Sequence, residues 1–217
     1  MISRATEDYL KTIYLLSESG GRVSTSSLAE KLDCSAASVT NMLQKLASLK
    51  LVSYQPYQGV RLTEPGERIA LEVIRHHRLI ELYLKEVLGY SWDKVHEEAE
   101  KLEHVISDEF AERIDKALGH PTHDPHGHPI PTKDGSLRSD QLPTLWEIPE
   151  ATDVVVTRVN DHDPSVLRYL DSLGIYPQVR IAVLAKAPFN GPLEVLVETV
   201  PRSLSEELAR QIFVTIE

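Results

Sequence analysis

One stretch of the chain combines imidazole and carboxylate side chains at a spacing that suits a metal site. KVHEEAEKLEHVISDE, residues 94–109, contains no glycine or proline, so the sequence predicts that it is helical and that the helix continues to about residue 118. On a helix with about 3.6 residues per turn, four of its side chains project from one face: His96, Glu100, Glu103 and His104. Carboxylates aligned in this way repel one another unless a cation neutralises them. The stretch therefore favours a divalent-cation site, with an ordinary solvated face as the alternative.

Two further groups of histidines lie close together in the sequence. Residues 64–89 have the pattern of a long helix, in which His77 and Glu81 are neighbours on one face and could hold an ion between them. The segment GHPTHDPHGHPIPTKDG contributes four more histidines, at positions 120, 123, 126 and 128. The prolines around them favour a rigid structural loop, with a metal site as the alternative.

The elements that must position these residues begin with the pattern of a winged helix-turn-helix. Helices are predicted over residues 6–19, 23–32 and about 35–49, and the tripeptide DCS predicts a tight turn between the last two. Two short predicted strands, 51–55 and 60–64, enclose PYQG and indicate a β-hairpin wing. This arrangement is typical of a DNA-binding module.

The second helix of this pair carries small, neutral and amide side chains on its outward positions. Such side chains approach base edges and phosphates without a steric or charge penalty, whereas a merely solvated face more often carries Glu and Lys pairs. The hairpin could reach the DNA backbone or minor groove, although an ordinary polar turn explains its composition equally well. The expected DNA-binding residues are Thr25, Ser35, Ala36, Ala37, Ser38, Thr40, Asn41, Gln44, Lys45, Tyr57 and Arg61.

Charge is unevenly distributed along the chain, whose net charge is −10. Residues 1–64 carry seven Lys and Arg against six Asp and Glu, whereas residues 65–217 carry 16 against 27. A uniformly basic nucleic-acid binder is excluded, and bound cations would lower the effective charge of the acidic remainder. Cys34 is the single cysteine, which excludes an internal disulfide and a thiolate cluster. Because the sequence has no apolar span of about twenty residues, we expect a cytoplasmic protein without a membrane partner.

The C-terminal region has the pattern of a small β domain. Its predicted strands cover residues 151–159, 178–187, 193–200 and 212–217. Predicted helices over residues 163–175 and 203–211 separate them. Together these elements indicate a small β-barrel.

The order of these features resembles the diphtheria-toxin-repressor family of metal-dependent transcriptional regulators. The resemblance is carried by the winged helix-turn-helix, by RHHRLIELYL, by the stretch 94–109, by HPTHDPHGHPIP and by the small β domain, and it covers essentially the whole chain. It implies a homodimeric transcription factor that divalent metal activates and that binds double-stranded DNA. A two-fold dimer presents the same helix twice, so we expect an inverted-repeat operator, and repression of metal-uptake genes.

The resemblance also implies a mainly α fold divided into three domains. A winged helix-turn-helix DNA-binding domain would occupy residues 1–64, and a helical metal-binding and dimerisation domain residues 65–134. A linker, 135–149, would lead to a small SH3-like (FeoA-like) β-barrel domain over residues 150–217.

The same resemblance implies two metal sites. The principal site would use Asp8, Glu100, Glu103 and His104. The second site would use His77, Glu81 and His96. The C-terminal domain would add ligands, for which the candidates are Asp161, His162 and Asp163.

Three positions compare this chain with the branches of the family. A methionine and a cysteine match Asp8 and Glu100 in the iron-responsive branch, whereas the manganese branch has carboxylates there, as this chain does. Lys11 departs from the short manganese regulators, which have a glutamate at that position. The family's cysteine before the tripeptide PHG is Asp124 here.

The donor types indicate which ion would bind. Oxygen-rich sites with imidazole and no sulfur suit Mn²⁺ or Fe²⁺, whereas thiolates would favour Zn²⁺ or copper. We therefore expect activation by Mn²⁺, with Fe²⁺ as the alternative and with Zn²⁺, Co²⁺ or Cd²⁺ as ions that bind in vitro. Two other functions stay open: a winged-helix regulator that senses an organic ligand, and a metal-dependent hydrolase. No separate nucleophile or set of oxyanion donors accompanies the acidic cluster, so we expect that the chain is not an enzyme.

Overall fold

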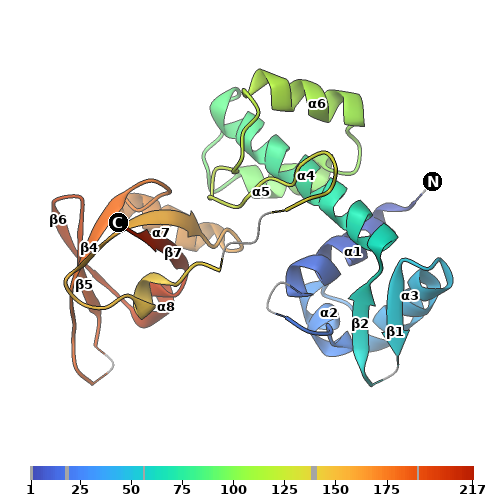
Figure 1. The fold of residues 1–217 in the computed structure, drawn as a ribbon, viewed down its shortest axis with the longest axis horizontal. Helices are drawn as coiled ribbons and strands as arrows, with labels where there is room; N and C mark the ends of the chain where they lie inside the picture. Colours follow the sequence, from blue (N-terminus) through green and yellow to red (C-terminus); the bar gives the residue numbers. More distant parts are fainter. Residues whose placement is uncertain (1, 18–19, 56, 138–140, 190) are drawn as a thin grey trace. The chain divides into compact units, whose positions relative to one another are not determined.

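The computed structural model describes residues 2–17, 20–55, 57–137, 141–189 and 191–217 of the 217-residue chain. The chain forms two compact units, each assembled from separate segments (Figure 1). The first unit contains residues 1–77, 101–111 and 131–137, and the second contains residues 78–100, 112–130 and 138–217. Among the described residues, no helix combines the length and the apolar character needed to cross a membrane.

The first unit contains the predicted winged helix-turn-helix. Its elements are α1 (Arg4–Ser17), α2 (Thr25–Lys31), α3 (Ala36–Ser48), β1 (Val52–Gln55) and β2 (Gly59–Leu62). The apolar positions that set the helical periodicity form one core, in which Leu10, Ile13, Val39, Leu43 and Leu46 are fully buried. Residues 18–19, at the end of the first predicted helix, and Pro56, in the hairpin turn, lie outside the described residues.

The helical periodicity fails at one position near the end of α3. Leu49 continues the helical spacing of Val39, Leu43 and Leu46, which predicts a buried position, but it is 54% exposed. The helix ends at Ser48, and Lys50 adopts a left-handed backbone conformation with φ 59° that turns the chain. As a result Leu51 enters the core, and the Leu51 backbone N–H donates to the Leu46 carbonyl.

The hairpin is tied to the start of α2 by a close backbone approach. β1 and β2 pair antiparallel, with Val52 opposite Leu62, and Val60 forms a further bridge with Val23. Gly59 has φ 81°, and a Cβ there would lie 2.6 Å from the Val23 carbonyl oxygen. Only glycine fits this position without moving the strand.

Three helices follow the hairpin: α4 (Glu64–Glu86), α5 (Val95–Leu102) and α6 (Asp108–Ala117). The prediction of one helix from residue 94 to about 118 is wrong, because the helix ends at Leu102, whose carbonyl accepts from the N–H groups of Val105 and Ile106. Ser107 then accepts a hydrogen bond from the Phe110 N–H, which is the pattern of a new helix start. Glu103 and His104 therefore lie in the turn between α5 and α6, and not on a helical face with His96 and Glu100.

The second unit contains a five-stranded antiparallel sheet in the order β6-β5-β4-β3-β7. Its strands are β3 (Thr152–Val159), β4 (Arg180–Lys186), β5 (Leu193–Val197), β6 (Val200–Leu204) and β7 (Ile212–Ile216). Short helices accompany the sheet: η1 (Leu145–Glu147), α7 (Pro164–Leu173) and α8 (Glu206–Ala209). The predicted SH3-like β domain is confirmed as a β-rich domain.

Two predictions in this region are corrected. Residues 193–200 are not one strand, since Glu198, with φ 54°, turns the chain between β5 and β6. The last predicted helix is shorter, because Ser203 and Leu204 belong to β6. Leu145 and Ile148, within the predicted linker 135–149, are buried in the core of the sheet, while linker residues 138–140 lie outside the described part.

Candidate metal centres and nucleic-acid interface

The first candidate centre joins α1 to the turn between α5 and α6. Asp8, Glu103 and His104 offer ligand atoms that all lie within 4.8 Å of one another. His104 Nε2 is 2.7 Å from Asp8 Oδ1 and 3.1 Å from Glu103 Oε1. Its other ring nitrogen, Nδ1, is 2.7 Å from a Glu7 carboxylate oxygen. Imidazole ligands of metals are commonly oriented by such a second hydrogen bond, which leaves the opposite nitrogen to face the ion.

One ring nitrogen of His104 lacks a hydrogen-bond partner among the described residues. Nε2 is buried and makes no hydrogen bond of acceptable geometry within the described residues, although two carboxylates surround it. A buried polar atom without a hydrogen bond is costly, and a cation placed among these three groups would satisfy it. The donor set therefore fits a divalent ion.

Lys11 supplies a positive charge next to this centre. Its side chain is buried, and Nζ donates to Glu103 at 2.7 and 2.9 Å and lies 3.3 Å from His77 Nδ1. The same His77 nitrogen contacts Glu103 Oε2. Burial alone would raise the pKa of Glu103, but the hydrogen bond and charge of His77 and the charge of Lys11 outweigh it and hold the pKa below its usual value. His77, expected in the second site, thus lies beside the first centre.

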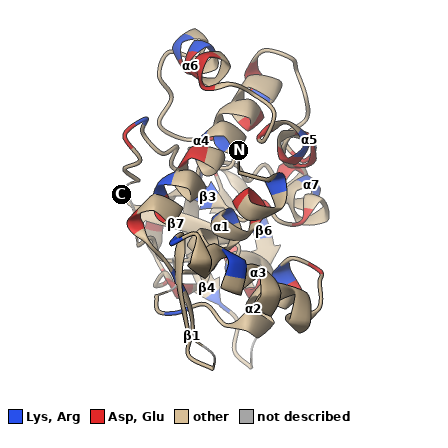
Figure 2. Ribbon diagram, turned by 90° about the vertical axis from the view of Figure 1, so that its right-hand side faces the viewer, with Lys and Arg blue, Asp and Glu red and all other residues tan. Residues whose placement is uncertain are grey.

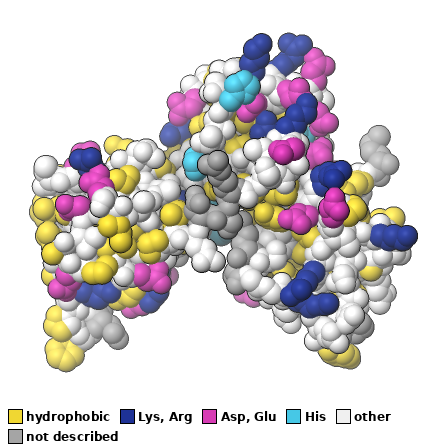
Figure 3. Space-filling model, viewed as in Figure 1, with side chains coloured by type: hydrophobic (Ala, Val, Ile, Leu, Met, Phe, Trp, Pro, Cys, Tyr) yellow, Lys and Arg dark blue, Asp and Glu magenta, His cyan; other side chains and the backbone are white. Residues whose placement is uncertain are grey.

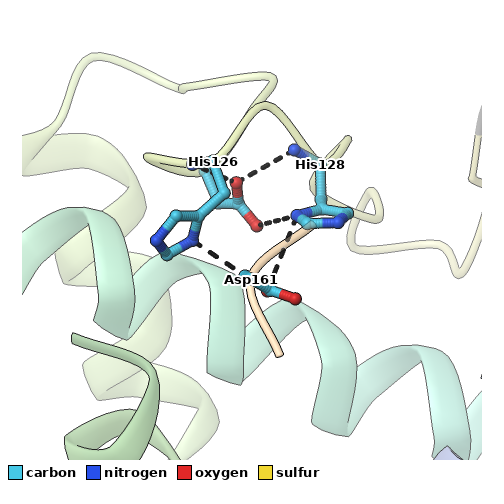
Figure 4. Close-up of side chains that lie close together, drawn as sticks. His126, His128 and Asp161 are labelled. Carbon is cyan, nitrogen blue, oxygen red and sulfur yellow. Dashed lines mark hydrogen bonds and ion pairs between the residues drawn. The ribbon is translucent and has the colours of Figure 1, made fainter. Parts of the chain in front are cut away.

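The second candidate centre lies in the second unit. Asp124, His126, His128 and Asp161 have ligand atoms within 4.8 Å of one another. Figure 4 shows both imidazole rings directed toward Asp161, whose Oδ2 is 3.9 Å from His126 Nδ1 and 3.7 Å from His128 Nδ1. His128 Nδ1 is also 3.3 Å from Asp124 Oδ2. These three atoms, Asp124 Oδ2, His126 Nδ1 and His128 Nδ1, are buried and make no hydrogen bond among the described residues.

Two of the predicted second-site residues border the same centre. Glu81 is fully buried, with Oε1 3.1 Å from His96 Nδ1 and Oε2 3.8 Å from His126 Nδ1. His96 Nδ1 is in turn 3.8 Å from Asp161 Oδ2. The structure therefore brings Glu81, His96 and Asp161 together as expected, and adds His126 to them.

The loop between α6 and the linker holds its imidazoles through backbone contacts. Asp124 Oδ1 accepts the N–H groups of His126 and His128 at 2.8 and 2.9 Å, which is a typical Asx turn. His126 Nε2–H donates to the Trp92 carbonyl at 2.8 Å, so that Nδ1 faces the carboxylates. Hydrogen bonds thus hold the loop in one conformation, as the prolines predicted. The loop also has the donor set of a metal site, which the sequence analysis gave as the alternative.

Gly127, between the two histidines, allows the loop to pack on β3. Its φ is 90°, and a Cβ there would lie 2.0 Å from the Thr157 carbonyl oxygen. The neighbouring His126 carbonyl accepts the Val159 N–H at 2.9 Å. No other residue fits this position without displacing the loop from the strand.

The carboxylates around His126 control its protonation. Burial would lower the pKa of His126, but the neighbouring Glu81 carboxylate, together with the charges of Asp124 and Asp161, raises it to about 9. Burial would likewise raise the pKa of Asp161, but the neighbouring His128 charge helps to lower it to about 2. Near neutral pH the centre therefore holds a proton that a divalent ion could replace.

Three candidate ligands are not gathered into these clusters. Glu100 lies in the last turn of α5, where its half-exposed carboxylate is 3.8 Å from His96 Nε2. Asp163 is exposed and caps α7, because it accepts the Ser165 N–H and hydroxyl at 2.8 and 2.7 Å. It belongs to none of the metal-binding groups that the described residues form. His162 is more than half exposed, with Nδ1 3.4 Å from Asp161 Oδ1.

The histidines of both centres are mostly interior. His77 and His126 are 5% and 0% exposed, and histidine contributes only small areas to the face drawn in Figure 3.

The sequence did not favour Asp124, His126 and His128 as metal ligands. The signal that could have found them is the pair of imidazoles around Gly127, two residues after an aspartate.

The expected DNA-binding residues lie at the start of α2, along α3 and at the hairpin. α3 contains one lysine and no acidic residue, in contrast to the acidic α5 (Figure 2). Thr25 and Thr40 are half-buried, and the Thr40 hydroxyl donates to the Ala36 carbonyl. The exposed members are Ser35, Ala36, Ala37, Ser38, Asn41, Gln44, Lys45, Tyr57 and Arg61. Ser35 also caps α3 by accepting the Ser38 N–H.

Comparisons with known proteins assign the parts of the chain. Residues 1–60 match the family described as "Iron dependent repressor, N-terminal DNA binding domain", and residues 63–132 match "Iron dependent repressor, metal binding and dimerisation domain". Residues 144–216 match the FeoA domain. The three matches follow the order of the predicted domains.

Individual relatives agree with these matches. The chain is 34% identical over 190 residues to the iron-dependent repressor IdeR of Mycobacterium leprae (strain TN). The aligned residues make up 82% of this chain and 83% of the relative. It is 34% identical over 163 residues to the diphtheria toxin repressor of Corynebacterium jeikeium (strain K411), covering 73% and 68% of the two chains. A solved structure described as a manganese-dependent transcriptional repressor in complex with manganese has a TM-score of 0.91 and 40% identity, and covers 98% of this chain and 100% of the other.

These matches span the DNA-binding elements, both candidate centres and the β domain. A domain for DNA binding and a domain for metal binding and dimerisation together indicate a homodimer that binds DNA, and not an enzyme. The chain therefore belongs to the iron-dependent repressor family that includes the diphtheria toxin repressor, and is a metal-dependent, DNA-binding transcriptional repressor.

Proposed function

We propose that Mn²⁺ activates this repressor, with Fe²⁺ as the alternative ion, and that metal binds at both candidate centres. The observation that carries the proposal is the donor set, because both centres offer carboxylate and imidazole groups and no sulfur. The single cysteine is engaged elsewhere, since Cys34 Sγ lies 3.5 Å from the Tyr9 hydroxyl. The manganese complex of a solved relative with 40% identity supports the same ion.

Each centre has its own proposed ligands. At the first centre they are Asp8, Glu103 and His104. At the second centre they are Asp124, His126, His128 and Asp161, with Glu81 and His96 beside them. The ion would supply the positive charge that lets these buried carboxylates lie close together.

The first centre suggests how metal could control DNA binding. Asp8 lies on α1, whose buried Leu10 and Ile13 belong to the same core as Val39 and Leu43 of α3. Holding Asp8 against the turn that carries Glu103 and His104 would therefore restrict α3 through this core. A dimer restricted in this way could place its two α3 helices in successive major grooves of an inverted repeat.

The experiment that tests this function is operator binding measured against free Mn²⁺. We expect chelator-treated protein to bind weakly and Mn²⁺ to tighten binding by at least about tenfold, or about 1.4 kcal/mol of coupling. A parallel titration with anaerobic Fe²⁺ ranks the two ions. Equal affinity with and without metal would instead favour control by an organic ligand.

Metal binding at the second centre is expected to release a proton. The pKa of His126, raised from 6.5 to about 9, keeps the ring charged at pH 7, and an ion on Nδ1 must displace that proton. Apparent Mn²⁺ affinity should rise about tenfold per pH unit up to the pKa of His126. Without metal, the charged ring stabilises the fold fully below pH 6.5, and this contribution is lost as the pH rises through about 9.

Calorimetry in buffers of different ionisation enthalpy measures this proton release directly. The binding heat at pH 7 should depend on the buffer, in proportion to about one proton per ion at this centre. If the binding enthalpy is the same in all buffers, metal binding releases no proton, and His126 is not a ligand that loses a proton on binding.

The contribution of α3 to DNA affinity can be tested at its one lysine. Lys45→Ala is expected to weaken binding to specific and unrelated sequences alike, because we expect this exposed lysine to contact a phosphate group. The salt dependence of log K should flatten by about one unit. Lys116→Ala, an equally exposed helical lysine on α6, is the matched control and should leave the salt slope unchanged.

A further inference from the structure

A third group of possible metal ligands lies in the first unit, outside both proposed centres. Glu72 and His76 stand four residues apart on α4, and Asp108 is the first residue of α6. Their ligand atoms all lie within 4.8 Å of one another. Residues four apart on a helix share a face, so α4 presents a carboxylate and an imidazole together to Asp108. We call these three residues the α4–α6 cluster.

The His76 ring is held in the orientation of a metal ligand. The His76 side chain is 10% exposed, and ring Nδ1 lies 3.4 Å from the Glu103 carbonyl oxygen. A carbonyl can only accept, so this contact places the proton of a neutral ring on Nδ1 and leaves the lone pair on Nε2. Nε2 is 3.8 Å from Asp108 Oδ1, which is too far for a hydrogen bond. The lone pair thus faces a carboxylate across a gap, as it does in a site that lacks its cation.

The two carboxylates lie close together with His76 as their basic neighbour and no described lysine or arginine paired with them. Burial and the charge of Asp108 raise the pKa of Glu72, and no ion pair between described residues joins either carboxylate to a lysine or arginine. Proximity of like charges is unfavourable unless a proton or a cation lies between them. A cation would also satisfy His76 Nε2, which a proton shared by the carboxylates would not.

A pocket of about 170 Å³ provides the room. It is lined by the α4–α6 cluster and also by Glu7, Glu103 and His104. Water can therefore reach an ion in the cluster and complete its coordination. Because Glu72 and Asp108 are exposed, their carboxylates give up more hydration on binding than those of the interior centres, which predicts a lower affinity.

We propose that Glu72, His76 and Asp108 form an additional, weaker site for a divalent cation of the Mn²⁺ or Zn²⁺ type. The two carboxylates suit Mn²⁺, and the imidazole suits Zn²⁺. An ion there would join α4 to α6 across the turn that carries Glu103 and His104, and His76 would hold that turn through the Glu103 carbonyl. This site is additional to the two centres of the proposed activation, and its existence does not depend on which ion activates the repressor.

The experiment is a Mn²⁺ titration of the full-length protein, monitored by electron paramagnetic resonance. The signal measures the concentration of free Mn²⁺, so the titration separates tight from weak binding steps. Glu72→Gln and Asp108→Asn remove one ligand charge each with little change of shape. We expect each to weaken the weakest step by at least about tenfold and to leave the tighter steps unchanged. Glu67→Gln, an exposed carboxylate of α4 outside the cluster, is the matched control and should bind like the unmodified protein.

Anomalous diffraction from crystals soaked in Mn²⁺ locates the ion independently. A peak between His76 Nε2 and the two carboxylates is expected in the unmodified protein and not in Asp108→Asn. The proposal is overturned if the weak step is identical in all four proteins, or if no peak lies at the cluster. If the unmodified protein shows no tight Mn²⁺-binding step, that result counts against activation by Mn²⁺, and not against this site.

Discussion

Replacing Glu103 by alanine is expected to abolish the metal response and to destabilise the protein even in chelator. Glu103 is 1% exposed, and its carboxylate is both a proposed ligand and the partner of buried Lys11. Its removal leaves an ammonium group buried without its carboxylate, and breaking a buried pair in this way costs about 3–5 kcal/mol. Operator binding with and without Mn²⁺ gives the first effect, and urea unfolding in chelator gives the second.

A double variant separates the two roles of Glu103. Lys11→Met combined with Glu103→Gln removes both charges at nearly constant volume, and such replacements of buried pairs are often neutral. The double variant should therefore regain most of the lost stability while DNA binding stays independent of Mn²⁺. If it recovers the metal response, Glu103 acts only as the partner of Lys11 and is not a ligand.

Asp161→Ala is expected to remove metal binding at the second centre almost completely. This buried carboxylate lies within 3.9 Å of ring nitrogens of His96, His126 and His128. Losing it takes away a ligand and the charge that favours cations at the centre. Mn²⁺ affinity at this centre should fall by about a hundredfold or more, as calorimetry would measure, while the tight binding of the first centre persists.

Asp163→Asn is the matched comparison, two residues further along the chain. Asp163 is exposed and caps α7, and asparagine caps helices about as well as aspartate. The variant should therefore bind Mn²⁺ at the second centre like the unmodified protein. The reverse result, with Asp163 required and Asp161 dispensable, would place the ligand of the C-terminal domain at the cap.

The winged helix-turn-helix could be predicted from the sequence because its signals are local. The apolar period of α3 is readable within a few residues, and the structure confirms it as far as Leu46. The helix predicted from residue 94 to 118 failed for a local reason as well. Ser107, followed by two acidic residues, starts a new helix, and this start signal outweighs the absence of glycine and proline.

The centres were less predictable because they depend on contacts between distant segments. Asp8, Glu103 and His104 were expected together through the family resemblance, but the geometry is that of a turn meeting a helix, and not of one helical face. The approach of Asp161 to the histidine loop depends on how that loop packs on β3, which composition does not show. The sequence likewise contains Lys11 without showing that its side chain is buried beside Glu103.

The fit of Gly127 against Thr157 has a consequence for the natural variation of this protein. With φ 90° and 2.0 Å between a hypothetical Cβ and the Thr157 oxygen, a mutation of this glycine displaces both flanking imidazoles at once. Selection for the second centre then acts on a residue that offers no ligand atom. Among descendants of one ancestor, lineages that lose the glycine should soon lose His126 and His128 as well, whereas lineages that keep both histidines should keep the glycine.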